Sequence, residues 1–206
     1  MFILNEPGNK TKKNEGKKPD IRFLYDLKGV LYDREWLKTA PNFELYYMYR
    51  GVEWKDELRY DITVIPPRML GQEFVKTKGH YHVGKKGELY IVLEGKGIFL
   101  LQKGNAEKGK IEDVYYVRAK KGESVLIPSF YGHITINPSF KRLKMANWIS
   151  KECRSDYKGI EKRKGACYYY LKSGWIKNRN YKIIPKLHFK WPKKILPKDI
   201  SFLYGQ

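Results

Sequence analysis

The 206-residue chain has only two cysteines, Cys153 and Cys167, fourteen positions apart. Two cysteines are too few for a disulfide framework, and neither belongs to a C-x-x-C pair of the kind found in metal and redox sites. We expect two free, partly buried thiols in a reducing compartment, with a single bridge between them as the alternative.

Long apolar runs are also missing. The start of the chain is apolar for only four residues before Glu6 and Pro7, whereas a signal peptide needs a basic start and a longer apolar region. No segment approaches the roughly 20 apolar residues that a membrane-spanning helix needs. We therefore expect a soluble cytoplasmic protein with no membrane partner.

Acidic residues are scarce relative to basic ones, with 22 Asp and Glu against 42 Lys and Arg and a net charge of +20. This balance attracts anions such as nucleic acid, anionic membranes and phosphorylated metabolites. A lysine-rich composition also occurs without any special partner, and the excess here is not confined to one short stripe. Charge alone therefore selects no partner.

Aromatic residues are abundant, with 17 tyrosines and nine phenylalanines, and such side chains favour a pleated, half-buried surface. Between Leu58 and Ile149, short apolar runs alternate with glycines and prolines, and no stretch sustains a helical period over three turns. The runs cover residues 59–65, 89–94, 97–102, 113–118, 124–128 and 144–149. Strands at this spacing predict an antiparallel sandwich or barrel.

Both ends of the chain differ from this middle region. Residues 5–20 are polar, which predicts a flexible arm over residues 1–20, and a short helix is expected to begin at Asp33. Residues 183–206 contain Pro185, Pro192 and Pro197 among lysines and aromatics, which excludes a long helix or a central strand. We expect a barrel domain over residues 21–182 and an extended basic tail, laid over the barrel or a partner.

Three of the four histidines, with one glutamate, form a candidate metal site. His80 and His82 are two positions apart, so on a strand both imidazoles point to the same face. Glu88 follows a turn and opens an apolar strand, where an unpaired inward carboxylate would be costly. His133 adds a third imidazole, and His188 in the tail is expected to be structural or solvent-facing. The set suits one divalent first-row metal, Fe, Mn, Ni or Zn, whereas an isolated pair of histidines would more often be solvated.

The spacing of these residues resembles that of the cupin superfamily. The run from His80 through Glu88 to Gly95 resembles the first cupin motif, and residues 122–137 resemble the second. Five residues separate His82 from Glu88, and Thr77-Lys-Gly-His-Tyr-His precedes them. These features resemble the cupin-type glucose-6-phosphate isomerases of archaea and some bacteria, over residues 18–182. The chain departs from the pattern at Phe74, Phe130, Trp148 and Ser155.

The resemblance implies an all-β double-stranded β-helix, or jelly-roll barrel, with short peripheral helices. It implies a metal-dependent enzyme of glycolysis and gluconeogenesis that interconverts glucose 6-phosphate and fructose 6-phosphate, working as a homodimer. His80, His82, Glu88 and His133 would be the ligands, and Glu88 would also be a candidate base beside Tyr90, which would contact the sugar. The phosphate contacts would be Thr63, Thr77, Gly79 and Tyr157.

Two other functions remain open. The same ligand set supports another cupin enzyme, either a different sugar isomerase or a metal-dependent dioxygenase, although a dioxygenase has no need of a phosphate site. A non-catalytic cupin could instead bind nucleic acid through residues 186–198, where Phe189 and Trp191 lie among lysines and bases can stack on aromatic rings. Within the isomerase hypothesis, a cis-enediol route through Glu88 and a direct hydride shift are both possible.

Overall fold

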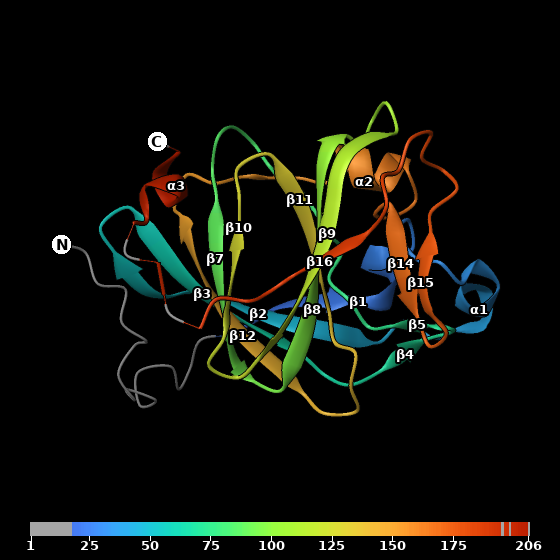
Figure 1. Cartoon of the computed structure of the whole chain (residues 1–206). Coiled ribbons are helices and arrows are strands. Elements are labelled where there is room, and N and C mark those ends of the chain that lie inside the picture. Colours follow the sequence, from blue (N-terminus) through green and yellow to red (C-terminus); the bar gives the residue numbers. More distant parts are fainter. Residues whose placement is uncertain (1–17, 195, 198, 206) are drawn as a thin grey trace.

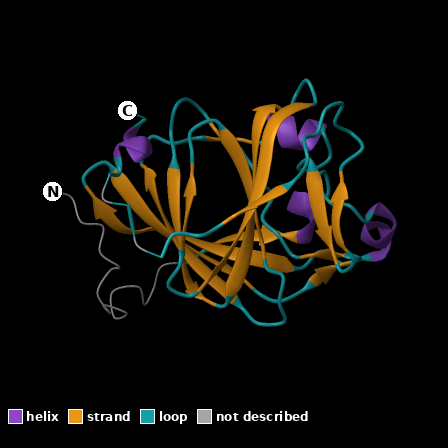
Figure 2. Cartoon of the chain, viewed as in Figure 1, coloured by secondary structure: helices purple, strands orange, loops and turns teal. Residues whose placement is uncertain are grey.

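Two sheets, antiparallel except for one parallel edge strand, face each other across an apolar interior (Figures 1 and 2). The computed structural model describes residues 18–194, 196–197 and 199–205. In spatial order, the larger sheet contains β1 (Asp20–Phe23), β2 (Glu44–Lys55), β3 (Leu58–Ile65), β12 (Leu143–Ser150), β7 (Glu88–Glu94) and β10 (Ser124–Ile127). The smaller sheet contains β11 (Tyr131–Ile136), β8 (Lys96–Asn105), β9 (Lys110–Lys120) and β16 (His188–Lys190).

The chain crosses repeatedly between the two sheets. Strands β7, β10 and β12 lie in the larger sheet, while β8, β9 and β11 lie in the smaller one. Strand β6 (Tyr81–His82) extends the smaller sheet beside β11 through the antiparallel bridge between His80 and His133. This alternation closes the two sheets into a jelly-roll barrel. The prediction of an all-β cupin barrel is therefore confirmed.

Strand β7 has apolar side chains on both faces because each face is covered. Tyr90 and Val92 belong to the core cluster between the sheets, together with Phe99 of β8. Leu89 and Ile91 point to the opposite face, as the period of two requires, and join a second cluster around Trp148. The sequence of a strand that is covered on both faces is one continuous apolar run, and residues 89–93 have this pattern.

Short elements surround the barrel. The helical ones are η2 (Leu24–Leu27), α1 (Arg34–Thr39) and α2 (Lys158–Lys162), and the added strands are β4 (Met69–Leu70), β5 (Glu73–Phe74), β13 (Ser155–Asp156), β14 (Tyr168–Leu171) and β15 (Gly174–Lys177). The expected helix start at Asp33 is confirmed, since its carboxylate accepts a hydrogen bond from Trp36 N at 3.0 Å. Within the described ranges, no helix is long and apolar enough to cross a membrane.

The C-terminal residues lie against the barrel. Strand β16 runs parallel to β9, and helix α3 (Ser201–Tyr204) contacts β7 and β12. At the other end, residues 1–17 of the predicted arm lie outside the described residues, and β1 already begins at Asp20. The domain boundaries at residues 20 and 182 stay predictions. Cys153 and Cys167 are free, as expected from their number and spacing.

Candidate metal centre

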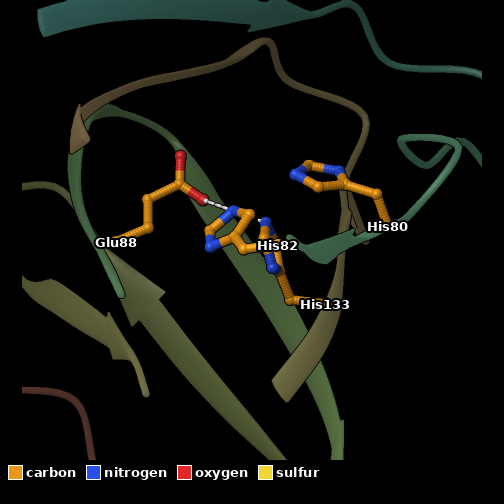
Figure 3. Close-up of side chains that lie close together, drawn as sticks. All are labelled: His80, His82, Glu88 and His133. Atoms are coloured by element: carbon orange, nitrogen blue, oxygen red, sulfur yellow. Dashed lines mark ion pairs between the residues drawn. The ribbon is translucent and has the colours of Figure 1, made fainter. Parts of the chain in front are cut away.

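Three chain segments bring the four candidate ligands together. His80 and His133 face each other across neighbouring strands, and each backbone N–H donates to the other residue's carbonyl, at 3.3 and 3.0 Å. His82 lies in β6, two residues beyond His80, and Glu88 is the first residue of β7. Figure 3 shows the four side chains pointing toward one another. The period of two places both imidazoles of the H-x-H pair on this side of the strand.

The distances within this cluster suit a bound metal ion. Glu88 Oε2 lies 3.1 Å from His133 Nε2 and 3.3 Å from His82 Nε2, and one ligand atom of each of the four residues lies within 4.8 Å of the others. Ligands about 2.1 Å from one ion, in tetrahedral or octahedral geometry, are roughly 3.0–3.4 Å from their neighbours. The cluster could therefore hold an ion with little rearrangement.

Three polar atoms of the cluster are buried without a hydrogen-bond partner among the described residues, and one of them is His133 Nδ1. The other two are His82 Nε2 and Glu88 Oε2. Although they lie within ion-pair distance of each other, this contact lacks hydrogen-bond geometry. Glu88 is 2% exposed and His82 is 7% exposed, so solvent does not satisfy these atoms. Unpaired buried polar atoms are rare in native proteins, and a cation between them would satisfy both. The donor set of three imidazoles and one carboxylate suits such an ion.

Burial and mutual contact also shift the pKa values within the cluster. Burial raises the pKa of Glu88, but the imidazoles of His133 and His82 outweigh it and hold that pKa well below its usual range. Burial lowers the pKa of His82, yet Cys153 and Glu88 raise it to about 10. The pKa values of His80 and His133 are lowered, chiefly by burial. His82 and Glu88 thus favour each other's charged forms, and a metal cation bound here would take the place of the proton on His82.

Neighbouring groups orient the imidazoles. His82 Nδ1 lies 3.1 Å from the carbonyl oxygen of Lys86, which leaves Nε2 facing Glu88. The Tyr90 hydroxyl lies 3.4 Å from His133 Nε2. A hydrogen bond to the second ring nitrogen fixes both the tautomer and the direction of a metal-binding histidine. The Lys86 carbonyl is placed to do this for His82.

A cavity of about 270 Å³ joins the cluster to the other predicted site residues. Besides His80, Glu88 and His133, its walls include the five candidates predicted to contact the substrate, Thr63, Thr77, Gly79, Tyr90 and Tyr157. The Thr77 hydroxyl oxygen accepts a hydrogen bond from Thr135 N at 3.0 Å, so its hydrogen can point into the cavity. All of the residues selected from the sequence except His82 thus line one pocket.

Several pocket residues were missed by the sequence analysis. The cavity is also lined by Arg22, Arg50, Arg59, Asp61, Lys78 and Cys153. Asp61 is buried and accepts hydrogen bonds from Arg59 at 2.9 Å and from Gly51 N at 2.7 Å. Arg22, Arg50 and Arg59 come from three different strands, β1, β2 and β3, so no local signal in the sequence marks them as neighbours. Of the two noted departures near the site, Ser155 lines the cavity, whereas Trp148 belongs to the core cluster on the opposite face of the larger sheet.

Residues 21–186 match the family model described as glucose-6-phosphate isomerase (GPI). The chain belongs to the glucose-6-phosphate isomerase family. The glucose-6-phosphate isomerase of Thermococcus litoralis is 30% identical over 184 residues, which cover 86% of this chain and 90% of that protein. The enzyme of the same name from Thermococcus onnurineus is 31% identical over 166 residues, covering 77% of this chain and 83% of its own length.

The segment matched to the glucose-6-phosphate isomerase family contains all four members of the metal cluster and every predicted phosphate contact. It ends before β16 and α3. The family match therefore accounts for the barrel and its pocket, but not for the C-terminal elements that lie against the barrel.

Proposed function

We propose that this chain interconverts glucose 6-phosphate and fructose 6-phosphate, with one divalent first-row metal ion held by His80, His82, Glu88 and His133. The observation that carries the proposal is the pocket in which this buried cluster faces a basic wall with threonine hydroxyls. The names of the family and of its archaeal members supply the reaction. The native metal is left open among Fe, Mn, Ni and Zn, all of which accept such ligands.

The phosphate group of the substrate would bind at the end of the pocket formed by Thr63, Thr77 and Gly79. Hydroxyl and backbone N–H groups bind phosphate oxygens well. Four basic side chains line the cavity against two carboxylates, Asp61 and Glu88, so the local charge favours a phosphate dianion. Lys78 Nζ lies 2.6 Å from Glu161 and 5.2 Å from the centre of the Tyr157 ring, which holds the lysine charge at this wall.

The reacting carbons, C1 and C2, would lie at the other end, beside Glu88 and Tyr90. A bound metal ion supplies Lewis acidity that polarises a carbonyl oxygen. The Tyr90 hydroxyl is buried, and burial raises its pKa well above the usual value, so it stays protonated and can donate a hydrogen bond to the sugar. The cavity walls exclude bulk water from this end, since Tyr90 is 7% exposed and His133 is 2% exposed.

Glu88 is the residue placed to move a proton. In the direction from glucose 6-phosphate, its carboxylate would remove the C2 proton while O1 gains a proton, which gives the cis-enediol. Glu88 would then give the proton it removed from C2 to C1, while the proton lost from O2 balances the proton gained at O1, which gives fructose 6-phosphate. The lowered pKa of Glu88 keeps the carboxylate ionised, which is the protonation state that a base requires. A direct hydride shift from C2 to C1 is the competing route and requires only alignment of the sugar.

Isomerisation in D₂O distinguishes these routes. Glucose 6-phosphate formed from fructose 6-phosphate would carry deuterium at C2 if a base exchanges its proton with solvent. A direct hydride shift would leave C2 free of deuterium. Mass spectrometry of the product measures the difference.

The proposed function is tested by comparing two histidine variants. His133 is buried in the cluster, whereas His188 is exposed on β16, with its Nδ1 3.8 Å from Asp113. His133→Ala should abolish conversion of fructose 6-phosphate to glucose 6-phosphate and lower metal content, while His188→Ala should retain both. An inactive wild-type chain, or equal activity of the two variants, would refute the proposal.

A second candidate function concerns the basic, aromatic tail. Phe189 and Trp191 line a groove of about 820 Å³ together with Tyr116, Arg118 and Lys194, and Trp191 is 82% exposed. Rings beside positive charge suit stacking with single-stranded nucleic acid. Salt-sensitive retention of an oligonucleotide that is lost in Trp191→Ala would support binding here, and absence of retention would exclude it.

The homodimer and the cytoplasmic location stay predictions.

A further inference from the structure

The short helix α3 is packed onto the barrel against β7 and β12, although it lies outside the segment matched to the family (Figure 1). Ile200, at the N-cap of α3, and Leu203, within it, are 6% and 0% exposed and belong to the core cluster that also contains Leu89 and Trp148. Leu89 directly follows Glu88 in β7. The helix is therefore held by the same strand that carries the carboxylate of the site.

The backbone of α3 also forms hydrogen bonds with the loop of residues 83–87. Gly87 N donates a hydrogen bond to the Phe202 carbonyl at 2.9 Å, and Lys86 Nζ donates to the Tyr204 carbonyl at 3.1 Å. The approach is close, because a Cβ atom on Gly87 would lie 2.6 Å from Cδ2 of Phe202. Glycine at position 87 thus allows the helix to sit directly on the loop.

This loop connects two members of the cluster. The Lys86 carbonyl accepts the hydrogen bond of His82 Nδ1 at 3.1 Å, and Gly87 immediately precedes Glu88. A shift of residues 86–87 would therefore move the group that orients His82 and the backbone that places Glu88. His80 and His133 are fixed separately, through their own pair of backbone hydrogen bonds.

We propose that α3 is a positioning element for the metal centre, acting through Lys86 and Gly87 on His82 and Glu88. The proposal rests on the proposed function, because it assumes that the cluster binds a metal ion. Loss of a group that orients a ligand typically lowers metal affinity about 10–100-fold. The phosphate end of the pocket, at Thr63 of β3 and at Thr77, is formed by segments other than residues 86–88 and should be unaffected.

The direct test is a chain that ends at Asp199. The readouts are Co²⁺ affinity, measured by titration against a competing chelator, the visible spectrum of the Co²⁺ form, and kcat and KM for fructose 6-phosphate. We expect affinity to fall 10–100-fold and kcat to fall at saturating Co²⁺, with an altered spectrum and an unchanged KM. A truncated chain that is folded by circular dichroism and keeps the affinity and spectrum of the full chain would overturn the proposal.

The chain that ends at Asp199 also lacks Leu203, which packs against Leu89 and Trp148. A point variant is therefore needed that leaves this packing intact. Lys86→Met removes the bond to Tyr204 but keeps the carbonyl that His82 uses. The matched control is Lys85→Met, an exposed lysine in the same loop. A second control, Glu152→Gln, removes the other partner of Lys86, an exposed carboxylate 3.4 Å from its Nζ.

Lys86→Met should weaken Co²⁺ binding several-fold at an unchanged melting temperature of the metal-free protein, while both controls bind Co²⁺ like the wild type. Equal affinity of Lys86→Met and Lys85→Met would overturn the inference even if the truncated chain does not fold. A full-length chain that binds no Co²⁺ and does not isomerise fructose 6-phosphate would refute both proposals. A full-length chain that does both, but is insensitive to these changes, would refute only the role of α3.

Discussion

His80 and His133 are 53 positions apart in the sequence, yet each donates its backbone N–H to the carbonyl of the other. This pair of hydrogen bonds joins β6 to β11 and fixes two imidazoles side by side, with their ring centres 4.5 Å apart. The backbone of the barrel therefore sets part of the ligand geometry before any metal binds. Such preorganisation by regular elements is what a precise metal site requires.

Gly79→Ala should disrupt this pairing. Gly79 has a φ of +80°, and a Cβ atom there would collide with the side chain of Ile134, the neighbour of His133. We expect a loss of about 1–3 kcal/mol in the free energy of unfolding from overpacking, and weaker metal binding. Gly84→Ala is the matched control, because Gly84 also has a φ of +80° but open space around it. Equal effects in urea denaturation would contradict this explanation.

Thr63→Val should weaken substrate binding without slowing the chemical step. The substitution keeps the shape of the side chain but removes the hydroxyl that would face the phosphate. A hydrogen bond to a charged group contributes about 1.5–3 kcal/mol, so KM for fructose 6-phosphate should rise about tenfold or more at a nearly constant kcat. The exposed Thr39 of α1 provides the control substitution. A fall in kcat at unchanged KM would contradict a role in phosphate binding and would assign Thr63 to the chemical step.

Glu88→Gln separates the two roles of this carboxylate. If Glu88 is the base, kcat should fall by roughly 10²–10⁴-fold, whereas metal affinity should fall much less, since the three imidazoles remain. Metal content and single-turnover rates measure the two effects on the same sample. Glu94→Gln, at the exposed end of the same strand, should change neither. Equal losses of binding and turnover would leave Glu88 as a ligand only.

Lys76→Met should destabilise the fold without changing a residue that lines the pocket. Lys76 and Glu73 are 3% and 1% exposed and pair at 2.5 Å, and Lys76 also donates to the Val30 carbonyl. Removing one member of a buried ion pair leaves an uncompensated charge, which typically costs about 3–5 kcal/mol. Lys38→Met, which breaks an exposed pair with Glu35, should have little effect in the same denaturant titration. Equal stability of the two variants would contradict the assigned role.

The barrel and the metal cluster were predictable because their signals are local or resemble a known pattern. Apolar runs bounded by glycine and proline gave the strands, and the period of two placed His80 and His82 on one face. The short strands β4 and β5 have two residues each and too little pattern to be found. Arg50 and Asp61 were missed because their pairing depends on how β2 and β3 are registered, which no single segment encodes.

The contact between the loop and α3 was equally hidden. Lys86 and Tyr204 are 118 positions apart, and the prolines of the tail suggested only an extended segment. Parallel pairing of β16 with β9 and the burial of Leu203 depend on long-range packing. Sequence patterns of this kind report the environment of each residue, but not which distant segment provides it.

Metal dependence of isomerisation is the most direct test of the central claim. The purified chain is stripped with a chelator, and conversion of fructose 6-phosphate to glucose 6-phosphate is measured before and after addition of Mn²⁺, Fe²⁺, Ni²⁺ or Zn²⁺. We predict that activity disappears on stripping and returns with at least one of these ions, at one ion bound per chain. Full activity in a chain with no bound metal, or no activity with any of the four ions, would contradict the account.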